Sequence, residues 1–157
     1  MAIPADDFVR FCERTIDGMV AAVRRLDDDE VNRPPPLVGG NTPYQLVTHA
    51  LSACAWWTSH IVCGRPSSRD RDSEFRARGL VAELENAAAH SKAALRDLLP
   101  TLATADRLHG VPMTQTELDG EWTVGAALIH AYEELAQHLG HLEVTVDLIL
   151  TGRSSNG

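Results

Sequence analysis

Apolar residues recur every three or four positions in four separate stretches of the sequence, and no stretch alternates convincingly like a β-strand. The first stretch runs from about Ala5 to Leu26 and contains the apolar series Phe8, Phe11, Cys12, Ile16, Met19, Val20 and Val23. This spacing places the series on one side of a helix. The following segments "DDDE" and "NRPPPLVGGN" end the helix, because consecutive prolines cannot continue it. The pattern predicts an all-α fold.

The second stretch has the signals of a helix start and a helix end. Thr42 is a predicted N-cap, Pro43 takes the first helical position, and Gln45 stands where a capping box requires it. The segment continues through "LVTHALSACAWWTSHIVC" to Gly64, which can adopt the left-handed conformation of a C-terminal cap. We expect a helix from Pro43 to the residue before Gly64.

Two further helices complete the predicted fold. The third begins near Ser73 and stops at Pro100, and a loop with at most a short turn in "TADRLHGVPMTQTELDG" leads to Trp122. The fourth, from about Thr123 to Leu150, is closed by Gly152. Four helices joined by loops of moderate length predict an antiparallel four-helix bundle, with residues 1–157 forming a single domain.

Charge and composition exclude several classes of protein. The formal net charge is −8, and the arginines are scattered or mixed with acids in "RPSSRDRDSEFRAR", which we interpret as a solvated loop, so nucleic acid is not an expected partner. No apolar run could span a bilayer and the N-terminus lacks a targeting pattern, which predicts a cytoplasmic protein that does not bind membranes. Three cysteines without a CxxC motif, at Cys12, Cys54 and Cys63, indicate reduced thiols.

The fourth helix gathers residues that bind metals. At about 100° per residue, His130, Glu134, His138 and His141 fall within about 80° of one another, beside the apolar stripe rather than opposite it. Glu133 points elsewhere and is expected to be solvated. Four ligand-type residues on one face favour a metal site, although each histidine taken singly could be hydrogen-bonded in a core instead.

The spacing leaves the ligand set open. Side chains four residues apart can share one ion, and His130 and His138 are too far apart to do so, so three neighbouring pairs remain: His130 with Glu134, Glu134 with His138, and His138 with His141. A third ligand would come from His49, His60, His90 or His109, of which the residue spacing slightly favours His49. The pattern is not HExxH, which disfavours a zincin protease. Trp56 and Trp57 are simply interpreted as core aromatics.

The segments "NTPYQLVTHALSACAWWTSHIVCGR" and "WTVGAALIHAYEELAQHLGHLEVTVDLIL" resemble the DinB-like superfamily, particularly its mycothiol-dependent branch. The resemblance implies a four-helix DinB-like fold with His49, Glu134 and His138 as metal ligands. His130, His141 and Trp56 would then lie next to the site or line its pocket. In having a glutamate at position 134, the chain resembles the maleylpyruvate isomerases. A His₂Glu set suits catalytic zinc, with nickel, iron or manganese as alternatives.

The resemblance implies an enzyme in which the metal activates a low-molecular-weight thiol for S-conjugation or isomerisation of a small electrophile. The single lysine, Lys92, against thirteen arginines suggests a GC-rich, actinobacterial genome, in which that thiol would be mycothiol. Two alternatives use the same residues: a non-catalytic, metal-stabilised bundle acting as a stress-related binding module, and a metal-assisted hydrolase. A homodimer through the apolar residues of the first helix is also expected.

Overall fold

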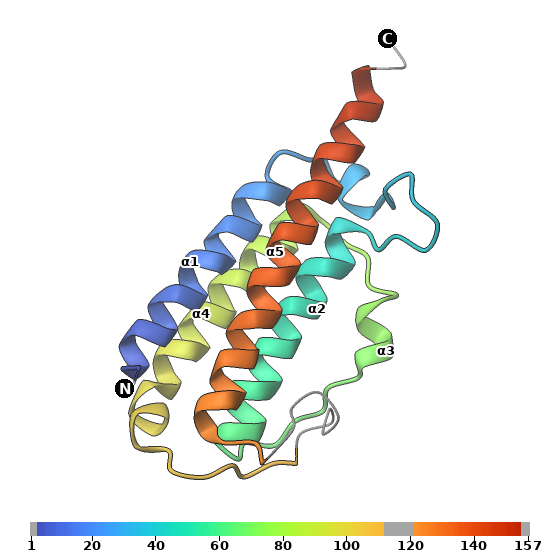
Figure 1. Cartoon of the computed structure of the whole chain (residues 1–157). Coiled ribbons are helices and arrows are strands. Elements are labelled where there is room, and N and C mark those ends of the chain that lie inside the picture. The colour runs from blue at the N-terminus through green and yellow to red at the C-terminus, as the bar shows by residue number, and fades with distance from the viewer. Residues whose placement is uncertain (1–2, 112–120, 155–157) are drawn as a thin grey trace.

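The computed structural model describes residues 3–111 and 121–154, and all regular structure in these ranges is helical (Figure 1). The all-α prediction is therefore confirmed. Four long helices lie side by side, and three short elements connect or extend them. The long helices are α1 (Ala5–Val23), α2 (Pro43–Ala55), α4 (Val81–Thr104) and α5 (Val124–Ser154). The short elements are the 3₁₀ turn η1 (Glu30–Asn32), the π-helix η2 (Trp56–Val62) and α3 (Arg71–Glu74).

Both predicted ends of the second helical segment are confirmed. The Gln45 amide donates to Thr42 Oγ1 at 3.2 Å, and the Thr42 amide donates to Gln45 Oε1 at 3.0 Å, which completes the capping box. The chain continues from α2 into η2 without a break and leaves the helical path at Gly64, whose φ is +69°. The switch to π-helical hydrogen bonding within this segment was not predicted.

The third predicted helix, starting near Ser73, is wrong in its boundaries, because the segment divides into α3 and α4. Between them, Asn32 binds the backbone of Gly79 on both sides: Nδ2 donates to its carbonyl oxygen at 2.7 Å, and Oδ1 accepts from its amide at 3.1 Å. These two bonds hold Gly79 outside helical geometry, so a contact with a residue far away in the sequence overrides the local periodicity.

Two predicted helix ends are also wrong. Pro100 lies inside α4, which continues to Thr104, and Gly152 lies inside α5. Because proline has no amide hydrogen, Pro100 leaves the carbonyl of Arg96 without its helical partner. Both residues are exposed, so water can bind that carbonyl instead. An exposed glycine weakens a helix by about 1 kcal/mol relative to alanine without ending it. The short turn expected in 104–120 lies largely outside the described residues.

The core lies between the long helices, where α5 packs against α1 and α2, and α1 packs against α4. Its fully buried members include Ile16 of α1, Leu46 of α2, and Leu135 and Leu142 of α5. Leu135 fixes the rotation of α5, since it turns the neighbouring Glu134 toward α2. Among the described residues, no helix is long and apolar enough to cross a membrane.

Candidate metal centre

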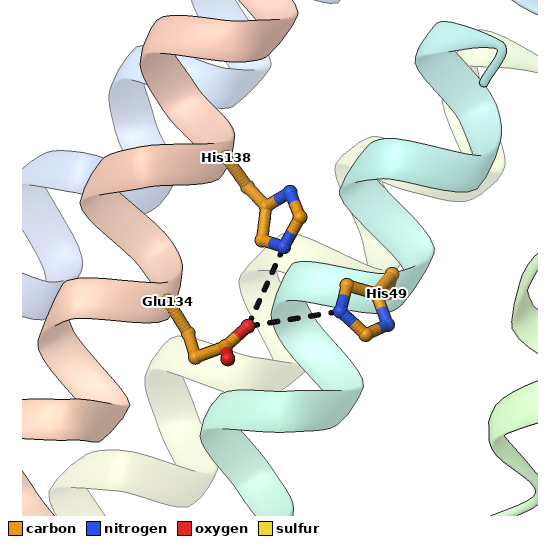
Figure 2. A group of neighbouring side chains, drawn as sticks. All are labelled: His49, Glu134 and His138. Carbon is orange, nitrogen blue, oxygen red and sulfur yellow. Dashed lines mark ion pairs between the residues drawn. The ribbon is translucent and has the colours of Figure 1, made fainter. Parts of the chain in front are cut away.

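Three side chains from two helices converge in the space between α2 and α5. His49 extends from the middle of α2, and Glu134 and His138 extend from successive turns of α5 (Figure 2). One ligand-type atom of each residue lies within 4.8 Å of the corresponding atoms of the other two. His49 is buried, whereas the side chains of Glu134 and His138 are 25% and 21% exposed, so the group is open on the α5 side.

The two distances from Glu134 to the histidines are close to those expected between ligand atoms around one ion. Glu134 Oε2 lies 3.6 Å from His49 Nε2 and 3.4 Å from His138 Nε2. Both separations exceed the usual hydrogen-bond range of about 2.7–3.2 Å for N–H···O. Ligands placed about 2.0–2.1 Å from a tetrahedral ion are about 3.3 Å apart. Two imidazoles and a carboxylate at this spacing could hold one divalent cation and leave a fourth position open.

The surrounding imidazoles keep Glu134 ready to bind a cation. Contacts with His138 and His49 hold the pKa of the Glu134 carboxyl far below its usual range, against the opposing effect of burial. The carboxylate is therefore ionised at neutral pH in the absence of any ion, and no proton needs to leave it when a cation arrives.

His130 and His141, which the resemblance places next to the site or in its pocket, each contact one member of this group. His130 Nε2 lies 3.5 Å from the second carboxylate oxygen of Glu134, and its Nδ1 lies 3.0 Å from Glu133. Glu133 is exposed, as predicted, although it pairs with His130. The exposed ring of His141 is stacked on that of His138 with the centroids 6.4 Å apart.

Glu74 is a neighbour of this group that was not predicted from the sequence. It is buried and lies 2.7 Å from His49 Nδ1, the ring nitrogen that faces away from Glu134. Burial alone would raise the pKa of the Glu74 carboxyl, but hydrogen bonds from Arg69, Ser52 and His49 lower it below its ordinary value. The predicted solvation of "RPSSRDRDSEFRAR" is therefore wrong at Arg69 and Glu74, whose side chains are 9% and 5% exposed. The one signal in the sequence was the isolated apolar residue Phe75, whose ring packs on His49.

An aromatic cluster lies beside the group at His130. The rings of Trp57 and Trp122 are stacked with their centroids 4.7 Å apart, and His130 meets both rings edge-on. Trp56, which the resemblance places next to the site or in its pocket, packs against Trp57, His60 and the guanidinium of Arg69. Both Trp56 and Trp57 are buried, as expected of core aromatics, but Trp57 is the one that reaches the neighbourhood of Glu134.

The other candidate ligands lie elsewhere. His60 Nδ1 donates to the carbonyl oxygen of Arg65 at 2.8 Å, His90 is exposed on α4, and His109 lies beside Gly64. None of the three belongs to a cluster that could hold a metal in the part of the chain that the structure describes.

The cysteines are free thiols, as predicted. Cys12 and Cys54 are buried together, and a hydrogen bond between them, assisted by burial, raises the pKa of Cys12 far above its usual range. Burial also raises the pKa of the half-buried Cys63. Low reactivity follows for Cys12 and Cys63, because the thiolate is the nucleophilic form.

Fold and site together define an all-helical protein with a possible His₂Glu metal-binding triad. The family model for mycothiol S-transferases matches residues 7–149, nearly the whole chain. The chain therefore belongs to the mycothiol S-transferase family, which confirms the suspected mycothiol-related DinB-like membership. No curated protein and no solved structure matches the chain.

Proposed function

We propose that the chain is a metal-dependent S-transferase that conjugates a low-molecular-weight thiol, mycothiol, to a small electrophile. His49, Glu134 and His138 would bind one divalent cation, with zinc as the first choice. The observation that carries the proposal is the donor spacing of 3.4–3.6 Å, which is too long for strong hydrogen bonds and close to the ligand separation around zinc. The family match supports the transferase activity and the thiol.

A cation in this site would lower the pKa of an approaching thiol, so that its sulfur is a nucleophilic thiolate at neutral pH. The residues of the chain divide the remaining tasks. Glu134, His49 and His138 would hold the ion, and His130 would orient Glu134 through the second oxygen of its carboxylate. His141 is exposed and stacked on His138, and it would carry the thiol proton to solvent.

The chemistry expected is displacement or addition at carbon. A sulfur–carbon bond forms, and with a chlorinated electrophile the carbon–chlorine bond breaks, releasing chloride and the thiol proton. Trp122, which is half-buried and is stacked on the buried Trp57 beside His130, offers an apolar surface to an electrophile next to the site. No cysteine of the protein is needed as a nucleophile.

The test uses zinc-loaded protein, mycothiol and monochlorobimane, with the fluorescent conjugate as readout. We expect conjugation well above the uncatalysed rate, and its loss in His138→Ala. His90→Ala, which removes an exposed histidine on α4, is the matched control and should keep full activity. If calorimetry detects thiol binding but no conjugate forms, the transferase activity is contradicted and the binding module remains as the function. Absence of both binding and conjugation would contradict the proposal altogether.

Three structural proposals accompany this function. We infer that α1, α2 with η2, α4 and α5 form an antiparallel four-helix bundle in a single domain, as the resemblance to DinB-like proteins implies. We also propose a homodimer through the exposed apolar residues of α1, of which Phe11 is 43% exposed. Sedimentation equilibrium tests the dimer, and a monomer at micromolar concentration would contradict it. The reduced thiols are consistent with a cytoplasmic location.

A further inference from the structure

The buried carboxylate of Glu74 accepts hydrogen bonds from three different residues. Oε2 accepts from His49 Nδ1 at 2.7 Å and from Arg69 Nη2 at 3.0 Å. Oε1 accepts from Arg69 Nε at 2.7 Å and from the hydroxyl of Ser52. Arg69 thus binds both oxygens in a bidentate pair, which is the strongest and most directional form of this interaction. Its guanidinium also lies over the Trp56 ring, 6.0 Å from the centroid.

This arrangement determines which nitrogen of His49 carries the proton. An ionised carboxylate can only accept hydrogen bonds, so the Nδ1 atom that faces Glu74 must be the donor. In the neutral imidazole, Nε2 then has a free lone pair. Nε2 faces Glu134, whose Oε2 lies 3.6 Å away (Figure 2). With Nδ1 bound to Glu74, Nε2 is the nitrogen of His49 that is left to bind an ion.

His138 has no corresponding anchor. Its Nδ1 is buried and has no hydrogen-bond partner in the part of the chain that the structure describes. Of the two imidazoles in the group, His49 alone is oriented by a carboxylate. Groups that bind a ligand imidazole in this way typically affect metal affinity by about 10- to 100-fold when they are removed.

We propose that Glu74, clamped by Arg69, is a positioning residue that fixes the tautomer and orientation of His49 and thereby sets the affinity of the site for its metal. The α3 segment is then part of the site, although it supplies no ligand. The statement about affinity rests on the proposed function, whereas the statement about the tautomer concerns the metal-free chain.

The first experiment measures zinc affinity in competition with a chromophoric chelator. Glu74→Gln keeps the size of the side chain but removes its charge, and in one of the two orientations of its amide it turns an N–H toward His49 Nδ1. We expect zinc binding to weaken about 10- to 100-fold. Glu143→Gln is the matched control, because Glu143 is exposed and lies about half a turn around α5 from Glu134. It should bind zinc like the wild type. Ser52→Ala, a milder change that removes one donor, should weaken zinc binding by a smaller factor.

The second experiment determines directly which ring nitrogen of His49 carries the proton. In the metal-free wild type, long-range ¹H–¹⁵N spectra should show His49 with the proton on Nδ1, and Glu74→Gln should give a mixture of tautomers. Unchanged affinity in both Glu74→Gln and Ser52→Ala, or a proton on Nε2 in the wild type, would overturn the inference and leave the proposed function intact. A wild type that binds no zinc would contradict the proposed function, while the tautomer would still test the role of Glu74. Circular dichroism verifies that each variant is folded.

Discussion

Removing the imidazole of His138 should abolish the stabilisation of the chain by zinc. The donor atoms of His49, Glu134 and His138 already lie within 4.8 Å of one another in the folded chain, and they come from helices that unfolding would separate. A zinc ion held by these three residues would therefore bind the folded state much more tightly than the unfolded state, and its binding should stabilise the fold.

The size of this effect follows from mass action. With free zinc about 1,000-fold above its Kd, the stabilisation is about 4.1 kcal/mol. A chain of this length shifts its Tm by about 2–4 °C for each kcal/mol, so zinc should raise the Tm by about 8–16 °C over the chelated protein. In His138→Ala, which loses one of three ligands, we expect the shift to fall to about 1–2 °C or less.

The assay is thermal unfolding followed by circular dichroism, with zinc and then with excess chelator. His141→Ala is the matched control, because this histidine lies on the same face of α5 and stacks on His138 but is not one of the three ligands. It should keep most of the zinc-dependent shift. Equal shifts in the wild type and His138→Ala would refute the ligand assignment, as would loss of the shift in His141→Ala alone.

Three further predictions concern the fold and the reactivity of Cys63. Leu135→Ala removes a fully buried side chain and should lower the free energy of unfolding by about 2–5 kcal/mol in urea titrations, with a loss below 1 kcal/mol arguing against the packing of α5. Gly64→Ala places a Cβ at φ +69° and 3.0 Å from His109, so it should cost about 1–2 kcal/mol in the same assay. Iodoacetamide should alkylate Cys63 more slowly than free cysteine near pH 8, because its raised pKa leaves less thiolate, and the rate should rise as the pH increases; a rate equal to that of free cysteine would contradict this.

The fold was predictable where the local sequence determines it. The capping box at Thr42 and the left-handed Gly64 are properties of a few neighbouring residues, and both are confirmed. The errors arose where distant contacts or solvent decide. Asn32 interrupts the third segment from far away in the sequence, and exposure allows Pro100 and Gly152 to remain inside helices.

The site was predictable in part for the same reason. The spacing on α5 identified the face that carries Glu134 and His138, but the resemblance rather than the spacing selected these residues and His49. Glu74 was not found this way, because only the adjacent apolar residue Phe75 sets it apart from the neighbouring acids. Its role follows from burial and from the distance to His49, which depend on how α3 packs against α2.

The side chains of Arg69, Glu74, His49 and Glu134 lie in a row, and their net charge affects which ligands can bind there. With neutral imidazoles, one guanidinium and two carboxylates sum to a single negative charge. A bound dication would invert this to a single positive charge in surroundings where uncompensated charge is costly. An anionic sulfur would cancel that excess, whereas a neutral water molecule would not. Charge balance, as well as the affinity of the ion for sulfur, would then favour a thiolate at this position.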